Sequence, residues 1–250
     1  MSRRPTIPVL AFHSIEAGPG PLRISPEVFE CVVEALVEAG ATAITARQAG
    51  LILDGANPGP PRPVVFTFDD GYRSVHQAAF PILQSAGWVG TIFPVTSAIG
   101  ERNTWDGAAG RSLELVSASE LVELSSAGWE IGGHTHHHVS LPSLRGADIA
   151  DELRQADAAL EGLLGVVPES FAYPYGHHDQ VSRSVAAQRY RWCWTIGAQR
   201  AASTDARDAL PRIEAWYVRR PHLARHLHDP VGALWLGARR VGRTVQERLR

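Results

Sequence analysis

Two adjacent carboxylates, Asp69 and Asp70, close an apolar run over residues 64–66 and precede Gly71. A β-branched and aromatic run that ends in charge is typical of a buried strand with a polar tip. Carboxylates at the mouth of such a strand are hard to desolvate unless a cation, a proton or a polar partner compensates them. A strand followed by an ordinary Asp-Gly turn is the plain alternative. The pair therefore indicates a site only if the chain also supplies positive charge.

A histidine cluster can supply that charge, because His134 and His138 stand four residues apart within the run 134–138. With Asp70 they form a set of two imidazoles and one carboxylate, which suits Zn²⁺ or a similar divalent ion and leaves a position for water. A metal there would lower the pKa of its water to about 7, and Asp69 is placed to take the proton as general base. A histidine run alone is weak evidence, but together with the carboxylate pair it predicts a metal site.

The elements that must position these groups alternate between strand and helix. The sequence predicts helices that begin near Pro26, Val75, Ala118 and Ile149, and strands over 7–12, 41–45, 64–69, 91–95, 171–173, 191–196 and 212–218. This alternation predicts one parallel α/β domain, closed or doubly wound, with its active site at the carboxyl ends of the strands. His13, the Asp pair, His134 and the segment 173–175 all fall at such ends.

Length and composition fit this reading. The chain has 250 residues, 44% apolar and 20% charged, which is ordinary for one globular domain. The net charge of −2 gives no general attraction to nucleic acid, and we expect none as a partner. Two distant cysteines imply no disulfide framework. The amino-terminal residues do not form a signal-peptide pattern, so the expected location is cytoplasmic.

Three motifs together resemble the polysaccharide deacetylase family. They are Thr67–Gly71, His134-Thr135-x-x-His138 with Leu141, and Phe171–Gly176. The resemblance runs from about residue 7 to residue 212. It implies a distorted (β/α)7 barrel and the metal-dependent removal of N-acetyl groups from glycans such as chitin, peptidoglycan and poly-N-acetylglucosamine.

The resemblance also implies roles for individual residues. Asp69 corresponds to the catalytic base, and Asp70, His134 and His138 correspond to the ligands of a divalent metal, with Zn²⁺ expected and Co²⁺ or Ni²⁺ as alternatives. The backbone N–H of Tyr175 corresponds to the donor that stabilises the tetrahedral oxyanion together with the metal.

Substrate contacts are expected from Pro174, in the same motif as Tyr175, and from two tryptophans. Trp194 lies where the family places apolar residues around the acetyl methyl group, although core packing is an equal alternative. Trp105, in a glycine-rich loop, could stack on a sugar. The remaining histidines near the motifs, His136, His137, His177 and His178, are not assigned a role.

The chain departs from the common family pattern in two places. Ala172 stands where most members carry an arginine, and no convincing late Leu-x-His motif supplies the general acid. However, Pro8–Ile15 is similar to the amino-terminal motif of the circularly permuted branch, which includes biofilm poly-N-acetylglucosamine deacetylases. That branch takes its acid histidine from the first strand, so the resemblance implies His13, whose ordinary pKa near 6.5 suits donation to a leaving amine.

The segment Tyr217–Arg250 differs from the rest of the chain. It holds eight arginines against Asp229 and Glu247, or 8 − 2 = +6, with apolar residues between them. The sequence therefore predicts a barrel domain over residues 1–216 and an Arg-rich, helical tail over 217–250. The tail is either an amphipathic helix that contacts an anionic inner membrane peripherally, or a helix that packs on the barrel.

The function that we predict is the hydrolysis of N-acetyl groups on an amino sugar or glycan. Water held by the metal attacks the amide, Asp69 acts as base and His13 as acid. Two alternatives stay open. The same site could act on a lipid-linked, formamide or imide substrate, or the scaffold could bind glycans without turnover.

Overall fold

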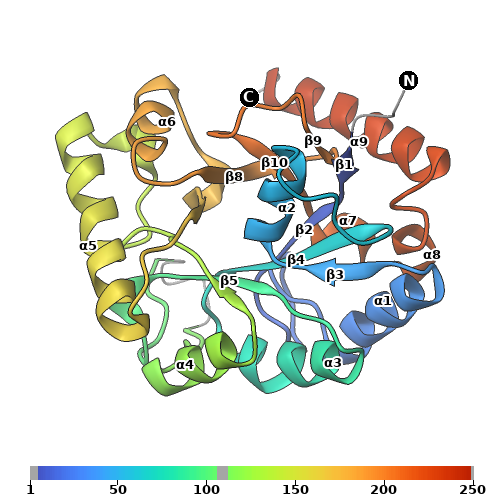
Figure 1. Ribbon diagram of the computed structural model, residues 1–250, viewed down its shortest axis with the longest axis horizontal. Helices are drawn as coiled ribbons and strands as arrows, with labels where there is room; N and C mark the ends of the chain where they lie inside the picture. The colour runs from blue at the N-terminus through green and yellow to red at the C-terminus, as the bar shows by residue number, and fades with distance from the viewer. Residues whose placement is uncertain (1–4, 106–111, 249–250) are drawn as a thin grey trace.

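The computed structural model describes residues 5–105 and 112–248, with side chains up to Arg239. Its main sheet is parallel and curls into an incomplete barrel in the order β6-β5-β4-β2-β10-β8-β7, with β3 beside β4 (Figure 1). The strands are β2 Val9–Phe12, β3 Thr42–Ile44, β4 Pro63–Asp70, β5 Thr91–Pro94, β6 Glu130–Ile131, β7 Ser170–Ala172, β8 Trp192–Gly197 and β10 Leu210–Glu214. The architecture is the predicted distorted (β/α)7 barrel.

The barrel closes only at one end of its seam. Gly133, just after β6, forms a parallel bridge with Phe171 in β7. The Gly133 N–H donates to the Ser170 carbonyl at 2.9 Å, and the Ala172 N–H donates to the Gly133 carbonyl at 2.9 Å. These bonds join the edge strands at their carboxyl ends, where the candidate site lies.

Most helices cover the outside of the sheet, whereas the helix Ala46–Leu53 lies across one end of the barrel and packs on the inner side chains (Figure 1). The helices are α1 Pro26–Glu38, α2 Ala46–Leu53, α3 Phe80–Ser85, α4 Ala118–Ser126, α5 Gly146–Leu164, α6 Gln180–Ala186, α7 Ala215–Val218, α8 Pro221–Ala224 and α9 Pro230–Arg248. The helix expected near Val75 begins as a π-helical turn over Val75–Ala79 and continues as α3. Pro81 lies in the first turn of α3, directly after the π-helical turn, so its missing N–H removes one backbone hydrogen bond at the point where the helix changes type.

Side chains alternate between two apolar layers. The barrel interior holds one layer and the space beneath the helices holds the other, since successive residues of a strand point to opposite faces. The inner cluster includes Val9, Val65, Phe93, Trp192 and Trp194, and the outer cluster includes Leu10, Phe12, Phe66, Phe68 and Ile213. This alternation places the side chains of odd-numbered residues of β2 and β4 inside the barrel.

One predicted strand needs correction, and one helix beside the strands was missed. The strand expected over residues 212–218 ends at Glu214 and is followed by α7. Its parallel neighbour β2 ends at Phe12, and Glu214 pairs with Ala11. Residues after Glu214 therefore have almost no backbone of β2 left to pair with. Helix α2 was not predicted, although Thr45 and Gln48 form a capping box at its start.

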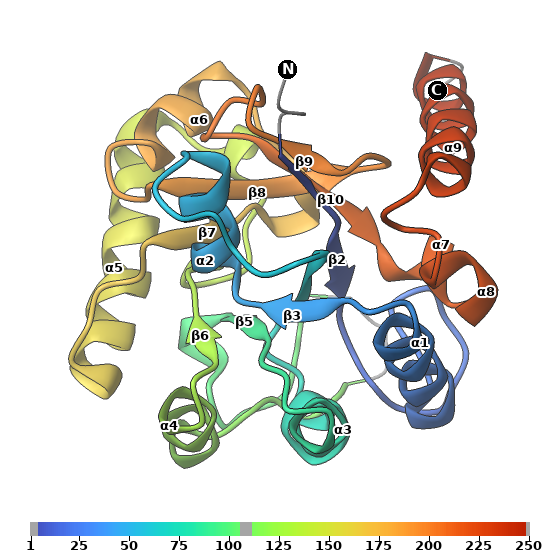
Figure 2. The ribbon, with the colours of Figure 1, turned by 45° about the vertical axis from the view of Figure 1, so that its right-hand side comes forward.

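Short strands and the carboxyl-terminal segment complete the fold. β1 Thr6–Ile7 pairs antiparallel with β9 Ala201–Ala202. After β10 the chain packs back on the barrel, because Val218, Leu227 and Leu236 are buried in the outer cluster. Figure 2 shows α9 at the margin of the molecule, beyond α7 and α8. The division at residue 216 stays a prediction, and it would cut through α7.

Among the described residues, no helix has both the length and the apolar character needed to cross a bilayer.

Candidate metal centre and active site

The site is built at the carboxyl end of β4. Asp69 and Asp70 are each 3% exposed. The alternation of the strand points Asp69 into the barrel, level with Thr67 and Val65 on the same face. Asp70 takes a positive φ of 69°, which breaks the extended backbone and turns the strand into its following loop. Adjacent carboxylates therefore face different partners.

Asp70 meets both histidines of the second motif. Its Oδ1 lies 3.3 Å from His134 Nε2 and 3.0 Å from His138 Nε2. One ligand atom from each of the three residues lies within 4.8 Å of the other two, and all three residues are buried. The structure thus brings together the three residues predicted as metal ligands.

The surroundings of this cluster fit a divalent cation. The Ala172 carbonyl lies 2.8 Å from His134 Nδ1, which leaves Nε2 free to act as the ligand atom. Burial alone would raise the pKa of Asp70, but hydrogen bonds from His134 and His138 hold that pKa well below its ordinary value. An ionised carboxylate and two imidazole nitrogens converging in a buried site are a donor set for Zn²⁺ or a similar ion.

The backbone around the cluster is strained. Asp70, Thr135, His138 and Tyr175 all have φ between 56° and 69°. Left-handed conformations cost non-glycine residues about 1–3 kcal/mol each and tend to gather at functional sites. Among the described residues, Arg62 is the one further non-glycine residue with positive φ. The strain therefore concentrates at the Asp-His-His cluster and at the motif that carries Tyr175.

Arg212 is the functional residue that sequence reasoning missed. It is fully buried on β10 and holds Asp69 by two hydrogen bonds, of 2.6 Å to Oδ1 and 2.7 Å to Oδ2. Burial would raise the pKa of Asp69, but the Arg212 charge, followed by that of His134, lowers it overall. A charged residue inside the apolar stretch of residues 210–213 was the available signal.

His13 follows directly after β2 and is partly exposed. The loop that it begins is fixed to the loop after Asp70, because Ser74 Oγ accepts the Ile15 N–H at 3.0 Å and lies 3.1 Å from Ser14 Oγ. The charge of His13 helps to lower the pKa of both Asp69 and Asp70. The predicted acid therefore lies within electrostatic reach of the carboxylate pair.

The predicted oxyanion and substrate residues lie at different depths. The rings of Tyr175 and Trp105 both lie 4.6 Å from the His138 ring, centroid to centroid. Trp105 Nε1 is buried without a hydrogen-bond partner among the described residues. Pro174 is buried in the turn Pro174–Gly176. Trp194 has no exposed surface and packs in the inner cluster, so a contact with the acetyl methyl stays a prediction.

The unassigned histidines have structural partners. His136 Nδ1 lies 2.8 Å from Thr96 Oγ1, and Glu152 accepts the His137 N–H and lies 3.0 Å from its Nδ1. His177 Nδ1 lies 3.3 Å from Ser140 Oγ. Burial lowers the pKa of His178. Glu152 thereby ties the loop between the two histidine ligands to helix α5.

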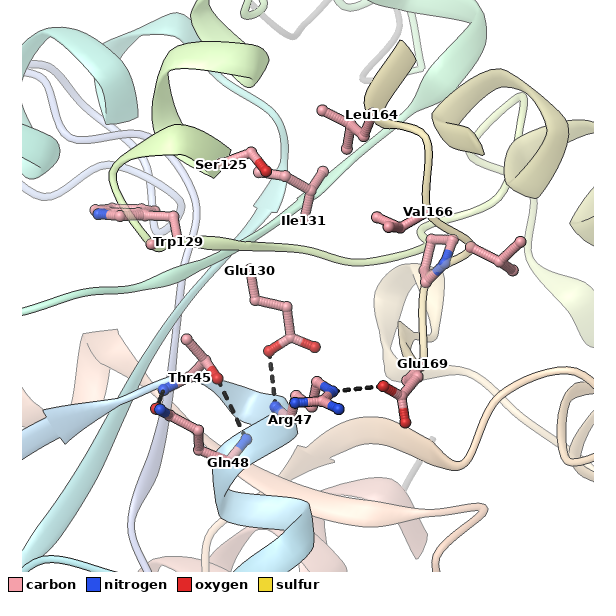
Figure 3. Close-up of a pocket in the computed structure, with 13 residues that line it drawn as sticks. Thr45, Arg47, Gln48, Ser125, Trp129, Glu130, Ile131, Leu164, Val166 and Glu169 are labelled. Atoms are coloured by element: carbon pink, nitrogen blue, oxygen red, sulfur yellow. Dashed lines mark hydrogen bonds and ion pairs between the residues drawn. The ribbon is translucent and has the colours of Figure 1, made fainter. Parts of the chain in front are cut away.

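A cavity of about 440 Å³ lies away from the Asp-His-His cluster (Figure 3). It opens at the amino ends of β6 and β7, where the seam of the barrel is not joined. Burial raises the pKa of Glu130 there, and this carboxylate accepts the Arg47 N–H at 2.7 Å. Arg47 also pairs with Glu169. The cavity contains none of the predicted site residues, and catalysis in barrels of this kind belongs to the opposite end of the strands.

Comparison with known proteins decides the family. Residues 56–189 match the family model described as polysaccharide deacetylase, which is more than half of the chain. The chain belongs to the polysaccharide deacetylase family. A Bacillus subtilis (strain 168) relative whose name assigns it to the same family, YxkH, is 26% identical over 83% of this chain and 70% of its own length.

A second relative matches a smaller part of this chain. The poly-beta-1,6-N-acetyl-D-glucosamine N-deacetylase of Staphylococcus aureus is 31% identical over 126 residues, 47% of this chain and 41% of that protein. This chain therefore spans less than half the length of that relative.

Solved structures of deacetylases share the fold. The Streptococcus pyogenes deacetylase PplD in complex with acetate superposes with a TM-score of 0.75 at 21% identity, over 84% of this chain and 92% of that one. IcaB from Ammonifex degensii superposes with a TM-score of 0.77 at 24% identity, over 88% and 97%.

Proposed function

We propose that this protein is a metal-dependent N-deacetylase of an amino-sugar glycan. The observation that carries the proposal is the arrangement around Asp69. A carboxylate held ionised by Arg212 lies beside a buried Asp-His-His donor set, and His13 is within electrostatic reach of Asp69 and Asp70. This combination supports the assignment of a base, a metal site and an acid to the carboxyl edge of the sheet.

A divalent ion held by Asp70, His134 and His138 would supply Lewis-acid polarisation of the amide carbonyl and lower the pKa of a water molecule to about 7. Asp69 accepts the proton of the attacking water, and Arg212 keeps its carboxylate oriented and ionised for that transfer. The backbone N–H of Tyr175 stabilises the oxyanion. His13 donates a proton to the amine nitrogen as the C–N bond breaks.

The glycan part of the proposal draws on the relatives. The Staphylococcus aureus relative is named for poly-beta-1,6-N-acetyl-D-glucosamine. A β-1,6-linked N-acetylglucosamine oligomer is therefore the first substrate to test, and Zn²⁺ the first metal.

The test is acetate release from N-acetylglucosamine oligomers of different linkage, with added Zn²⁺ and with a chelator. Acetate that is released with Zn²⁺ and disappears with the chelator supports the proposal. Retained metal without acetate from any oligomer contradicts the glycan assignment and directs the search to lipid-linked, formamide or imide substrates. Tight sugar binding without hydrolysis under any metal would instead indicate a glycan-binding protein.

A further inference from the structure

A second, smaller cavity adjoins the predicted acid. It has a volume of about 160 Å³ and is lined by His13, Leu22, Glu214 and Trp216, among others. Its position is informative, because His13 is proposed to donate its proton to the sugar nitrogen. His13 lines this cavity, whereas Asp70, His134 and His138 do not. A sugar unit joined to the nitrogen that His13 protonates can therefore extend into the cavity, while the acetyl group stays with the metal ligands. This part of the argument rests on the proposed function.

The strand register explains why Glu214 lines this cavity. Glu214 pairs with Ala11 on the neighbouring parallel strand β2. Paired residues on parallel strands point to the same face, and so do residues two apart on one strand. Glu214 therefore shares the inner face with Ala11 and with Arg212 on its own strand. His13 follows β2 directly and lines the same cavity.

The carboxylate of Glu214 is placed to take a ligand. Arg212 directs its guanidinium to Asp69 with two hydrogen bonds. The next described arginine along the chain, Arg219, lies 3.4 Å above the ring of Trp216. Glu214 itself is partly exposed, at the point where β10 turns into α7.

Trp216 adds an aromatic surface beside this carboxylate. Its side chain is 40% exposed although its neighbour Ala215 is buried. Arg219 covers one face of the ring, so a sugar can contact only the other face or the ring edge. A carboxylate provides a hydrogen-bond acceptor or a counter-ion for an ammonium group. The cavity is smaller than the 300–1,000 Å³ of sites for drug-sized ligands, which suits one sugar unit.

We propose that this cavity is a subsite for the sugar unit next to the reacting one, and that Glu214 makes it prefer a unit with a free amine. A 2-amino sugar is an ammonium ion near neutral pH, whereas its N-acetylated form is neutral. Glu214 therefore distinguishes the two by charge, and Trp216 contacts the ring of either. An enzyme with this subsite acts faster on a glycan that is already partly deacetylated.

The experiment compares β-1,6-linked N-acetylglucosamine trisaccharides. One is fully acetylated, and the others have lost one acetyl group beside an acetylated unit. Acetate release by the full-length protein with Zn²⁺ is measured against concentration. We expect a KM about two- to fivefold lower for at least one partly deacetylated isomer, as is usual for a partly exposed ion pair, and a smaller difference at high salt.

Variants assign the preference to Glu214. Glu214→Gln should bring the KM ratio of the two substrates close to one. Glu161→Gln, which removes the same charge from an exposed position on α5, should keep the wild-type ratio. Trp216→Ala should raise KM for both substrates without changing their ratio, since both present a sugar ring. A wild-type protein without the preference, or a Glu214→Gln variant that retains it, overturns the proposal.

Failure of the proposed function remains distinguishable from failure of the subsite. If no trisaccharide releases acetate, binding of the fully deacetylated trisaccharide is measured directly by calorimetry. Weaker binding to Glu214→Gln than to wild type and Glu161→Gln supports the subsite. Equal binding to all three overturns it.

Discussion

At the scale of single residues, the central feature is a carboxylate that a buried arginine keeps ionised. Arg212 has no exposed surface and donates two hydrogen bonds to Asp69. Such a bidentate pair fixes both the charge and the orientation of the carboxylate. The neighbouring Asp70 faces His134 and His138 instead. One residue step on a strand therefore separates the proposed base from the proposed metal ligand.

Substitutions of Asp69 and of His134 should separate proton transfer from metal binding. Asp69→Asn should keep bound Zn²⁺ but lower the acetate-release rate by about 10²–10⁴-fold, because general base catalysis has that size. His134→Ala should lose both Zn²⁺ and activity. Asp151→Asn, at an exposed position on α5, is the matched control. Full activity in Asp69→Asn would exclude this residue as the base.

The Arg212 contact should be visible in the pH dependence. The Arg212 charge and hydrogen bonds lower the pKa of Asp69, so the base is lost only as pH falls through that low value. In Arg212→Met the pKa of Asp69 should rise, and the acid limb of the kcat/KM profile should move to higher pH. Arg212→Lys, which keeps the charge, should move it less. An unmoved limb in Arg212→Met contradicts the role of Arg212.

The same substitution also bears on stability. Asp69 has a folded pKa below its unfolded one, so its pairing stabilises the fold above the unfolded pKa and this stabilisation is lost as pH falls through the folded pKa. Removing one partner of a buried pair typically costs about 3–5 kcal/mol. We expect a loss of that order for Arg212→Met at neutral pH in urea unfolding, and a smaller loss near pH 3.

At the scale of elements, the loop between the two histidine ligands depends on helix α5. Thr135 and His138 both have positive φ, a conformation that persists only when surrounding contacts hold it. Glu152 on α5 supplies such contacts through the N–H and the ring of His137. The Ala172 carbonyl orients His134 from β7 in the same way.

Glu152→Ala should therefore weaken metal binding although Glu152 is not a ligand. Losses of about 10–100-fold are usual when a residue that orients a ligand is removed. Zn²⁺ affinity by competition with a chelator measures the effect, with Glu161→Ala on the same helix as the control. Unchanged affinity would show that the loop keeps its conformation without Glu152.

At the scale of the whole molecule, the carboxyl-terminal segment joins the barrel through apolar contacts. Leu236 on α9 is 3% exposed and belongs to the outer core cluster, whereas Leu234 is 77% exposed. Packing and exposure thus alternate along one helix. The packing does not exclude the membrane contact that the basic composition suggests, which stays a prediction.

Deletion from Pro230 onward should weaken binding to vesicles that contain anionic lipid and have little effect on neutral vesicles, because basic residues add electrostatic attraction. Leu236→Ala keeps every arginine and should lower the free energy of unfolding by about 2–5 kcal/mol. Comparing the two by co-sedimentation separates charge from packing. Equal binding by the deleted and full-length chains would remove the segment from any membrane role.

The sequence by itself determined the alternation of strands and helices, the strand tip at Asp69–Asp70 and the histidine spacing, since these depend on local patterns of apolar and polar residues. It also indicated the family through three motifs, each of which is a short continuous stretch of sequence. The ends of strands were harder to predict. The carboxyl end of β10 was placed four residues too late, at 218 instead of Glu214, because the end of its neighbour β2 sets this limit.

The tertiary structure alone decided which distant residues meet. Arg212 lies 143 positions from Asp69 along the chain, and no local pattern connects them. Parallel pairing of β2 with both β4 and β10 brings them to one inner face. The same pairing places Glu214 beside His13. A contact between strands depends on register, and register is a property of the closed sheet that no single segment contains.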